Sequence, residues 1–196
     1  MLSEGRSWIA AVLILSGAAI VIGATTVLLF PHLIPGFLDL LDKFFREILG
    51  DVEDQTNFEL ARGLVRQNLK ASLLDLFLGV MVGIVPAVSI GLNFFTLGFL
   101  GGAFFLPADV SGASGSFSLF LLAILPHGIF ELPALILSAS FGLRLGIGWL
   151  LPSASGHRRG VFKHNLAGAV VIVPVVAVLV VIAGFVEAYV TGSLVR

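Results

Sequence analysis

Two side chains that could do chemistry, His127 and Glu131, lie four residues apart within a long apolar run. They are the only ionisable side chains in residues 117–143, and Pro126 and Pro133 flank them. The run is long enough to cross a bilayer, which takes about 20 residues. Ionisable groups at membrane depth are costly unless they are paired or hydrated. The pair could therefore bind a metal ion or transfer a proton. Alternatively, it could be a buried pair that fixes a bend in the chain.

A metal site would need more than this pair. Zinc sites commonly use at least three protein ligands, and the H-x-x-x-E spacing differs from the H-E-x-x-H pattern of zinc peptidases. The chain has no cysteine, and His32, His157 and His164 lie in expected loops. We therefore expect no cofactor, with a metal ion at His127 and Glu131 as the alternative.

Other polar side chains interrupt the apolar parts of the chain. With the pair, they make up the candidate intramembrane polar residues: Asn68, Asp75, Asn93, His127, Glu131 and Glu187. Asn68 and Asp75 are seven residues apart, which places them on one face of a helix. We expect Asp75 or Glu187 to join the His127–Glu131 pair, and Arg144 is the natural cationic candidate for Glu187.

Glycines recur at the G-x-x-x-G spacing that lets helices approach closely. There are three such pairs: Gly79 and Gly83, Gly98 and Gly102, Gly142 and Gly146. We expect these glycines to form helix contacts. For Gly79 and Gly83, which continue the face of Asn68 and Asp75, a polar seam facing a cavity is the alternative.

The composition indicates an integral membrane protein. Of 196 residues, 58% are hydrophobic and 12% are charged, and the mean hydropathy is +1.08. Soluble domains are about 25% charged. The net charge of −1 gives no basic surface for nucleic acid. The expected partners are the lipid bilayer, further copies of this chain, and protein partners in the membrane or envelope.

The first half of the chain predicts three different helices. Trp8–Phe30 is uncharged and predicts a transmembrane helix. Phe37–Leu49 separates apolar from charged residues at helical spacing, which predicts an amphipathic helix in the bilayer interface or against a neighbouring subunit. Thr56 and Glu59 have capping-box spacing, and the helix that they begin could run unbroken to Val85.

Two later stretches are too long for one straight span. Residues 71–106 allow a break in the middle, near Pro86 and Asn93, and residues 117–151 have their interruption at positions 126–133. There we expect a helix to begin at Pro126 or near Glu131, because proline deep in a helix removes a hydrogen bond. Interrupted helices or tight hairpins fit both stretches. A polar, basic loop at residues 152–163 precedes the last span, residues 165–190.

These elements predict an all-α fold, a polytopic transmembrane helical bundle. It has about five to six membrane segments with broken or hairpin helices, plus one interfacial amphipathic helix. The expected regions are an N-terminal transmembrane helix, the amphipathic helix with an acidic turn, and a multispan core: residues 1–36, 37–55 and 56–196. Lysine and arginine concentrate in residues 31–70 and 152–163. If both long stretches cross the cell membrane once, or both cross it twice, the two basic loops lie on one side and both termini on the other. The excess of positive charge then predicts that the basic loops are cytoplasmic and that both termini are external.

Residues 125–134 read Leu125-Pro-His-Gly-Ile-Phe-Glu-Leu-Pro-Ala134, and a glycine-flanked segment that ends at Gly146 follows them. This part of the chain resembles the stage II sporulation protein M family. Further elements of the family are resembled, in the same order along the chain, by Asn68, the Gly79–Gly83 pair, Asn93 and residues 182–191. The resemblance covers about Phe58 to Gly192 and leaves the first helix and the amphipathic helix outside. Phe94 and Gln67 depart from the expected glycine and asparagine.

The resemblance implies a multispan protein of a family named for engulfment during sporulation, in which members act as membrane anchors for wall-remodelling partners. It carries over no enzymatic activity. Our first functional hypothesis is therefore a non-enzymatic scaffold. The alternatives are a transporter or channel that uses the intramembrane polar residues, and a metal-dependent intramembrane hydrolase with His127 and Glu131 as ligands.

Overall fold

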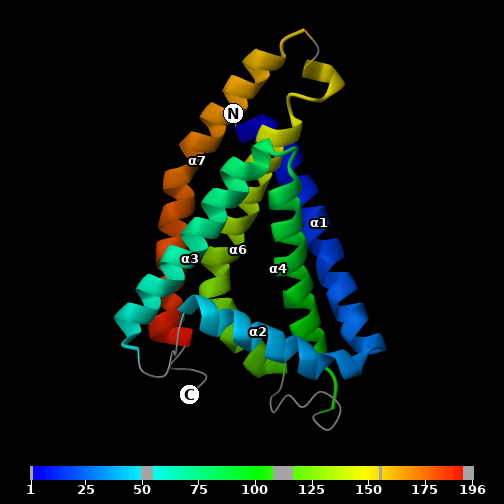
Figure 1. The fold of residues 1–196 in the computed structure, drawn as a ribbon, viewed down its shortest axis with the longest axis vertical. Coiled ribbons are helices and arrows are strands. Elements are labelled where there is room, and N and C mark those ends of the chain that lie inside the picture. The colour runs from blue at the N-terminus through cyan, green and yellow to red at the C-terminus, as the bar shows by residue number, and fades with distance from the viewer. Residues whose placement is uncertain (1, 50–54, 108–116, 155, 192–196) are drawn as a thin grey trace.

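The computed structural model describes residues 2–49, 55–107, 117–154 and 156–191, and these residues form an all-α bundle (Figure 1). The helices are α1 (Leu2–Leu29), α2 (Ile34–Leu49), α3 (Asn57–Phe77), α4 (Ile84–Ala103), α6 (Phe117–Ile147) and α7 (Arg158–Val186). A π-helical turn, Glu187–Thr191, follows α7. The predicted fold class is confirmed.

Four helices are long and apolar enough to cross a membrane, counted within the described ranges. They are Gly5–Leu29, Ile84–Ala103, Phe120–Ile147 and Arg158–Thr191. Apolar side chains on their outer faces are exposed, as lipid contact requires. The more polar α3 runs beside these helices, and α2 lies across one end of the bundle (Figure 1). We call the end crossed by α2 the lower end, and the end where α7 begins the upper end.

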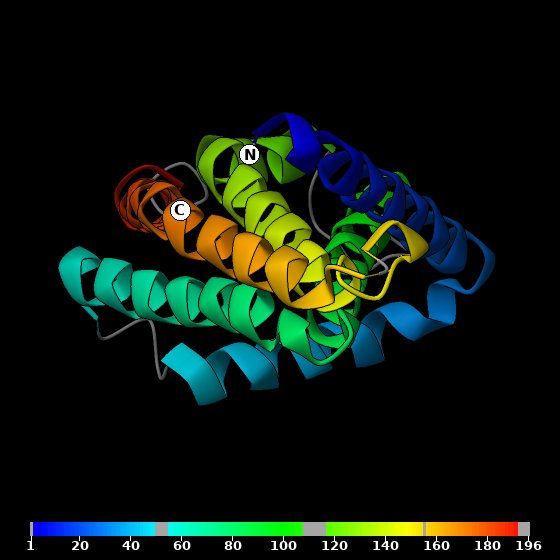
Figure 2. The ribbon, with the colours of Figure 1, turned by 90° about the horizontal axis from the view of Figure 1, so that it is seen from above.

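Helix α6 lies between the two halves of the bundle. Seen from above, α3 and α7 lie on one side of it, and α1 and α4 on the other (Figure 2). One buried apolar cluster joins α6 to α3 and α7 through Phe141 and Leu145. A second cluster joins it to α1 and α4 through Ala139 and Leu143. The N-terminal helix α1 packs mainly along α4, so it is an integral part of the bundle.

The chain reverses between α3 and α4 earlier than the sequence predicted. Helix α3 ends at Phe77 instead of continuing to Val85, and a tight turn leads into α4. Val82 and Gly83 both have positive φ, at 56° and 71°, which a helix interior does not allow. The prediction of a break near Pro86 and Asn93 is therefore wrong. Pro86 instead lies in the first turn of α4. Backbone N–H groups there have no partner within the helix, so a proline loses no helical hydrogen bond.

Helix α6 is continuous through the expected interruption at residues 126–133. It contains both Pro126 and Pro133, and it begins at Phe117. The predictions of a helix start at Pro126 or near Glu131 are therefore wrong. Membrane helices tolerate proline because neighbouring helices and local adjustments compensate for the lost hydrogen bond. In this bundle the second half of α6, from Leu132 to Ile147, is packed on both sides.

Helix α1 begins at the upper end of the bundle, and the π-helical turn after α7 lies toward the lower end (Figure 1). The first long stretch forms the end of α3 and the whole of α4, of which only α4 is among the four candidate spans, and the second forms α6, which is one of them. The number of crossings, and the side of the membrane on which each terminus lies, stay predictions. The predicted basic loop at 152–163 is also shorter, because Arg158 already begins α7.

Candidate functional site

His127 is the centre of a polar cluster in the lower half of the bundle. Its Nδ1 contacts Oε2 of Glu187 and lies 3.4 Å from the hydroxyl of Thr191. Its Nε2 lies 3.9 Å from Oε2 of Glu131. One imidazole is thus placed between two carboxylates that come from different helical segments.

Asn68 extends the cluster to a third helix. Its side-chain Nδ2 on α3 donates a hydrogen bond to Oε1 of Glu131 on α6 across 2.9 Å. The cluster therefore connects α3, α6 and the segment after α7. A hydrogen bond to a carboxylate is stronger than one between neutral groups, so these contacts are suited to holding the three helices in register.

The local helix geometry explains why these side chains converge. His127 and Glu131 share one face because α6 is continuous and they are four residues apart. Glu187 and Thr191 have the same spacing and bound the π-helical turn. A π-helical turn widens the end of α7, and such turns are frequent at functional sites. Both pairs thus face each other at the α6–α7 contact.

The cluster is only partly enclosed. The His127 side chain is 16% exposed, whereas those of Glu131 and Glu187 are 35% and 33% exposed. Thr191 is buried. The imidazole is thus covered and the two glutamate side chains are partly exposed, although Oε2 of Glu187, which contacts the imidazole, is itself buried. An imidazole between two carboxylates is a set of groups that could exchange a proton with one another.

The described residues include no group of three or more His, Cys, Asp or Glu side chains that could hold a metal ion. A zinc site of the kind considered from the sequence would need at least three protein ligands. The pair His127 and Glu131 does not supply that set, so no metal-dependent step follows from this geometry.

Asp75 and Asn93 do not join the cluster. Asp75 is buried near the upper end of α3, where the Ser89 hydroxyl donates to its Oδ2 across 2.8 Å. Asn93 is exposed on α4, and its Nδ2 donates to the Ser89 carbonyl in its own helix across 2.9 Å. The candidate polar residues thus separate into two groups instead of lining one path.

Arg144 is not the partner of Glu187. It lies in the last turn of α6 at the upper end, and it is buried. Thirteen residues of helix separate it from Glu131, which corresponds to about 20 Å. Asn165 on α7 donates to its backbone carbonyl across 2.9 Å. His127 occupies the position beside Glu187 that the sequence had suggested for this arginine.

Two of the glycine pairs face each other. An added Cβ at Gly79 would lie closer than 3.0 Å to the backbone of Gly142, and one at Gly146 would meet the backbone of Gly79 and Gly83. The α3–α4 turn and the end of α6 therefore approach backbone to backbone. Gly83 also has a left-handed conformation that a side chain would strain.

The third pair, Gly98 and Gly102, faces α1. An added Cβ at Gly98 would lie closer than 3.0 Å to the backbone of Ile20. Gly23 on α1 completes this contact, because a Cβ there would meet the backbone of Phe95 and Phe99. Sequence reasoning missed Gly23, which lacks a glycine four residues away. It also missed Thr191 as a cluster member, although its spacing from Glu187 repeats that of His127 and Glu131.

Comparison with known proteins assigns the chain to a family. Residues 11–192 match the model of the stage II sporulation protein M family. The chain is also 27% identical over 131 residues to an uncharacterized protein of Methanocaldococcus jannaschii, an alignment that covers 67% of this chain and 70% of that protein. No solved structure matches.

The chain belongs to the stage II sporulation protein M family, as the resemblance indicated, and it is a membrane protein. The family region begins within α1. The expectation that the first helix and the amphipathic helix lie outside it is therefore wrong.

Proposed function

We propose that this member of the stage II sporulation protein M family is a non-enzymatic membrane scaffold that holds a partner protein at the bilayer surface through α2. The observation that carries this proposal is the placement of α2. It lies across the lower end of the bundle instead of along it (Figure 1). A helix in that position runs parallel to the membrane, where a partner outside the bilayer can reach one side of it.

The start of α2 packs on the bundle. Ile34 is buried, and the Phe37 ring lies 4.3 Å from that of Phe99 on α4, measured between ring centroids. Further along, Leu40 and Phe44 are exposed. The exposed apolar residues suit insertion among lipid chains, which would fix the helix in the interface.

The other side of α2 carries charges of both signs. Lys43 pairs with Asp39 at 2.8 Å, and Arg46 pairs with Asp42 at 2.9 Å, all in exposed positions. Exposed pairs of this kind add little to stability. A row of charges of both signs at the membrane surface is instead suited to recognising a partner of complementary pattern.

A photo-crosslinking amino acid at Lys43, on the charged side of α2, tests the scaffold proposal in native membranes. We expect a protein adduct of defined mass from this position, and its yield should fall when Asp39→Lys and Asp42→Lys alter the charge pattern. The same crosslinker at Val171, an exposed apolar position on α7, is the control and should react with lipid alone. Lipid adducts alone from Lys43, or a protein adduct insensitive to the charge changes, would refute the proposal.

The polar cluster favours a second candidate function, proton-linked transport. Its basis is the π-helical turn, which places Glu187 against His127 while both glutamate side chains stay partly exposed. Ionisable groups inside a membrane protein commonly belong to proton or ion pathways. In liposomes with an internal pH dye, this candidate predicts proton uptake that His127→Ala abolishes and His32→Ala leaves unchanged. Equal uptake by both variants and by protein-free liposomes would exclude it.

A further inference from the structure

A groove of about 470 Å³ lies along the outer side of α3. The buried residues Ser72, Asp75 and Leu76 mark the side of α3 that faces the other helices. The groove is on another side, where Leu74 and Phe77 are exposed. Seen from above, α3 lies near the edge of the bundle on the same side as α2 (Figure 2). Neither proposed function uses this groove.

The charge of the groove changes along its length. Arg66 and Lys70, both exposed, line the part nearer the start of α3. That start lies toward the lower end of the bundle, which α2 crosses (Figure 1). Side chains of a helix lean toward its N-terminus, so these long cationic chains can extend toward the lower end. The other described lining residues are apolar, namely Leu69, Leu73, Leu74, Phe77 and Leu78.

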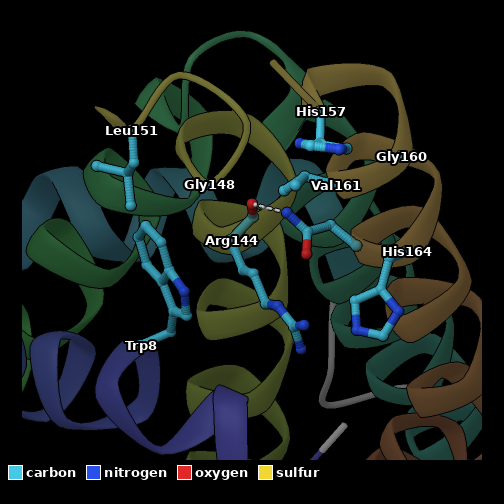
Figure 3. Close-up of a pocket in the computed structure, with 9 residues that line it drawn as sticks. Trp8, Arg144, Gly148, Leu151, His157, Gly160, Val161 and His164 are labelled. Atoms are coloured by element: carbon cyan, nitrogen blue, oxygen red, sulfur yellow. Dashed lines mark hydrogen bonds between the residues drawn. The ribbon is translucent and has the colours of Figure 1, made fainter. Parts of the chain in front are cut away.

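The two cations of the groove are open to a partner from outside the chain. Among the described residues, neither Arg66 nor Lys70 forms a hydrogen bond or an ion pair, and no Asp or Glu lines the groove. The pocket at the upper end differs, because Arg144 and His164 in its lining already interact within the protein (Figure 3). Charged side chains beside membrane-spanning helices are costly unless they are paired. The α3 groove is therefore suited to an anion that the chain itself does not supply.

The groove also matches one leaflet of a bilayer in length. Arg66 and Phe77 are separated by about 16 Å along the axis of α3. The hydrocarbon core of a bilayer is about 30 Å thick, so one leaflet contributes about 15 Å. Cations at one end of the groove and apolar side chains beyond them repeat the order of headgroup and acyl chain in a lipid. A lipid of the leaflet at the lower end would thus fit with its headgroup toward α2.

We propose that the α3 groove binds an anionic phospholipid from the leaflet at the lower end of the bundle. The phosphate lies between Arg66 and Lys70, which attract it as cations near a membrane surface attract anionic lipid, and an acyl chain follows Leu73, Leu74 and Phe77. A lipid fits better than an acidic protein segment, because the adjoining helices α4 and α7 also expose apolar side chains, as lipid contact requires. This inference is independent of the scaffold and transport proposals, because neither uses the groove.

Paired substitutions test the charged part of the groove. Arg66→Gln with Lys70→Gln removes both cations, and because both side chains are exposed, the fold should tolerate the change. The matched control is Arg158→Gln with Arg159→Gln, which removes two exposed cations at the upper end. Thermal unfolding without added lipid verifies that both variants are folded.

The apolar part of the groove has a test of its own. Leu74→Gln places an amide where the acyl chain would lie. Leu92→Gln is the matched control, because Leu92 is also exposed, at 63% against 42% for Leu74, but lies on α4 outside the groove.

The experiment uses the full chain in a neutral detergent, with phosphatidylglycerol and phosphatidylcholine as separate probes. Native mass spectrometry counts the lipids that are retained and also reports the number of protein copies. We expect phosphatidylglycerol to bind about tenfold more tightly than phosphatidylcholine. Arg66→Gln with Lys70→Gln should remove this preference, and Leu74→Gln should weaken the binding of both lipids. Both control variants should behave like the wild type.

Each other result would overturn the proposal. Equal binding of the two lipids to the wild type would show that the groove does not select for charge. If the Arg66 and Lys70 variant retains phosphatidylglycerol as well as the upper-end control does, the anion is bound elsewhere. If Leu74→Gln acts no more strongly than the α4 control, the acyl chain does not follow the groove. A wild-type dimer that the Arg66 and Lys70 changes dissociate, with lipid binding unaltered, would show that a second copy occupies the groove.

Discussion

Asn68 on α3 donates a hydrogen bond to Glu131 on α6 across 2.9 Å, although 63 residues separate the two in the chain. The bond joins the first helix of the α3–α4 hairpin to the helix at the centre of the bundle. Glu131 also faces His127, so its two oxygens have different partners on different helices. The carboxylate is thus the link between α3 and the α6–α7 contact.

Replacing Asn68 with alanine should lower the free energy of unfolding by about 1 kcal/mol, because Glu131 loses a hydrogen-bond donor while partly shielded from solvent. Thermal unfolding in detergent would measure it. Asn93→Ala is the matched control, since Asn93 is exposed and donates only within its own helix. Equal losses for the two variants would show that the contact between α3 and α6 has no special role.

Gly146→Ala should destabilise the bundle by about 1–3 kcal/mol, because the new methyl group would overlap the backbone of the α3–α4 turn. Gly91→Ala provides the control: a Cβ there meets nothing within 4 Å, and alanine favours helix over glycine by about 1 kcal/mol. Chemical denaturation should therefore move the two midpoints in opposite directions. A Gly146→Ala midpoint at or above the wild-type value would contradict the backbone contact.

The sequence predicted best those features that local pattern determines. The apolar run after Trp8 and the amphipathic helix after Phe37 follow from composition and periodicity. The capping box is present, with the Glu59 N–H donating to the Thr56 hydroxyl and the Thr56 N–H to the Glu59 carboxylate. Each of these depends on residues within one helix, where spacing alone fixes the geometry.

Features set by contacts between helices could not be read in the same way. Local preference indicated a helix break around Pro126 and Pro133, yet α6 is continuous through both prolines, and its second half is packed on both sides. The reversal before α4 depends on the positive φ of Val82, a residue type that rarely adopts it. The pairing of His127 with Glu187 depends on how α7 lies against α6, and periodicity within either helix contains no information about it.

A double-mutant cycle on His127 and Glu187 should show coupling of about 1 kcal/mol or more, because each alanine substitution removes the other residue's contact. The same cycle on His127 and Asp75 is the control. Asp75 bonds to Ser89 near the upper end, so that pair should be additive within about 0.5 kcal/mol. If unfolding in detergent shows that the effects of the His127 and Glu187 substitutions simply add, then the contact between these two residues does not contribute to stability.

The capping box should make the stability of α3 dependent on pH. The pKa of Glu59 lies below its ordinary value because its carboxylate accepts hydrogen bonds from the backbone N–H and the hydroxyl of Thr56. A carboxyl group whose pKa is lower in the folded protein stabilises it above the ordinary pKa, and this contribution is lost as the pH falls through the lowered value. Wild type should thus unfold at a higher temperature than Glu59→Gln at neutral pH, and the difference should shrink as the pH falls below the ordinary pKa of a glutamate. A difference that is constant with pH would show that the Glu59 charge does not act through this cap.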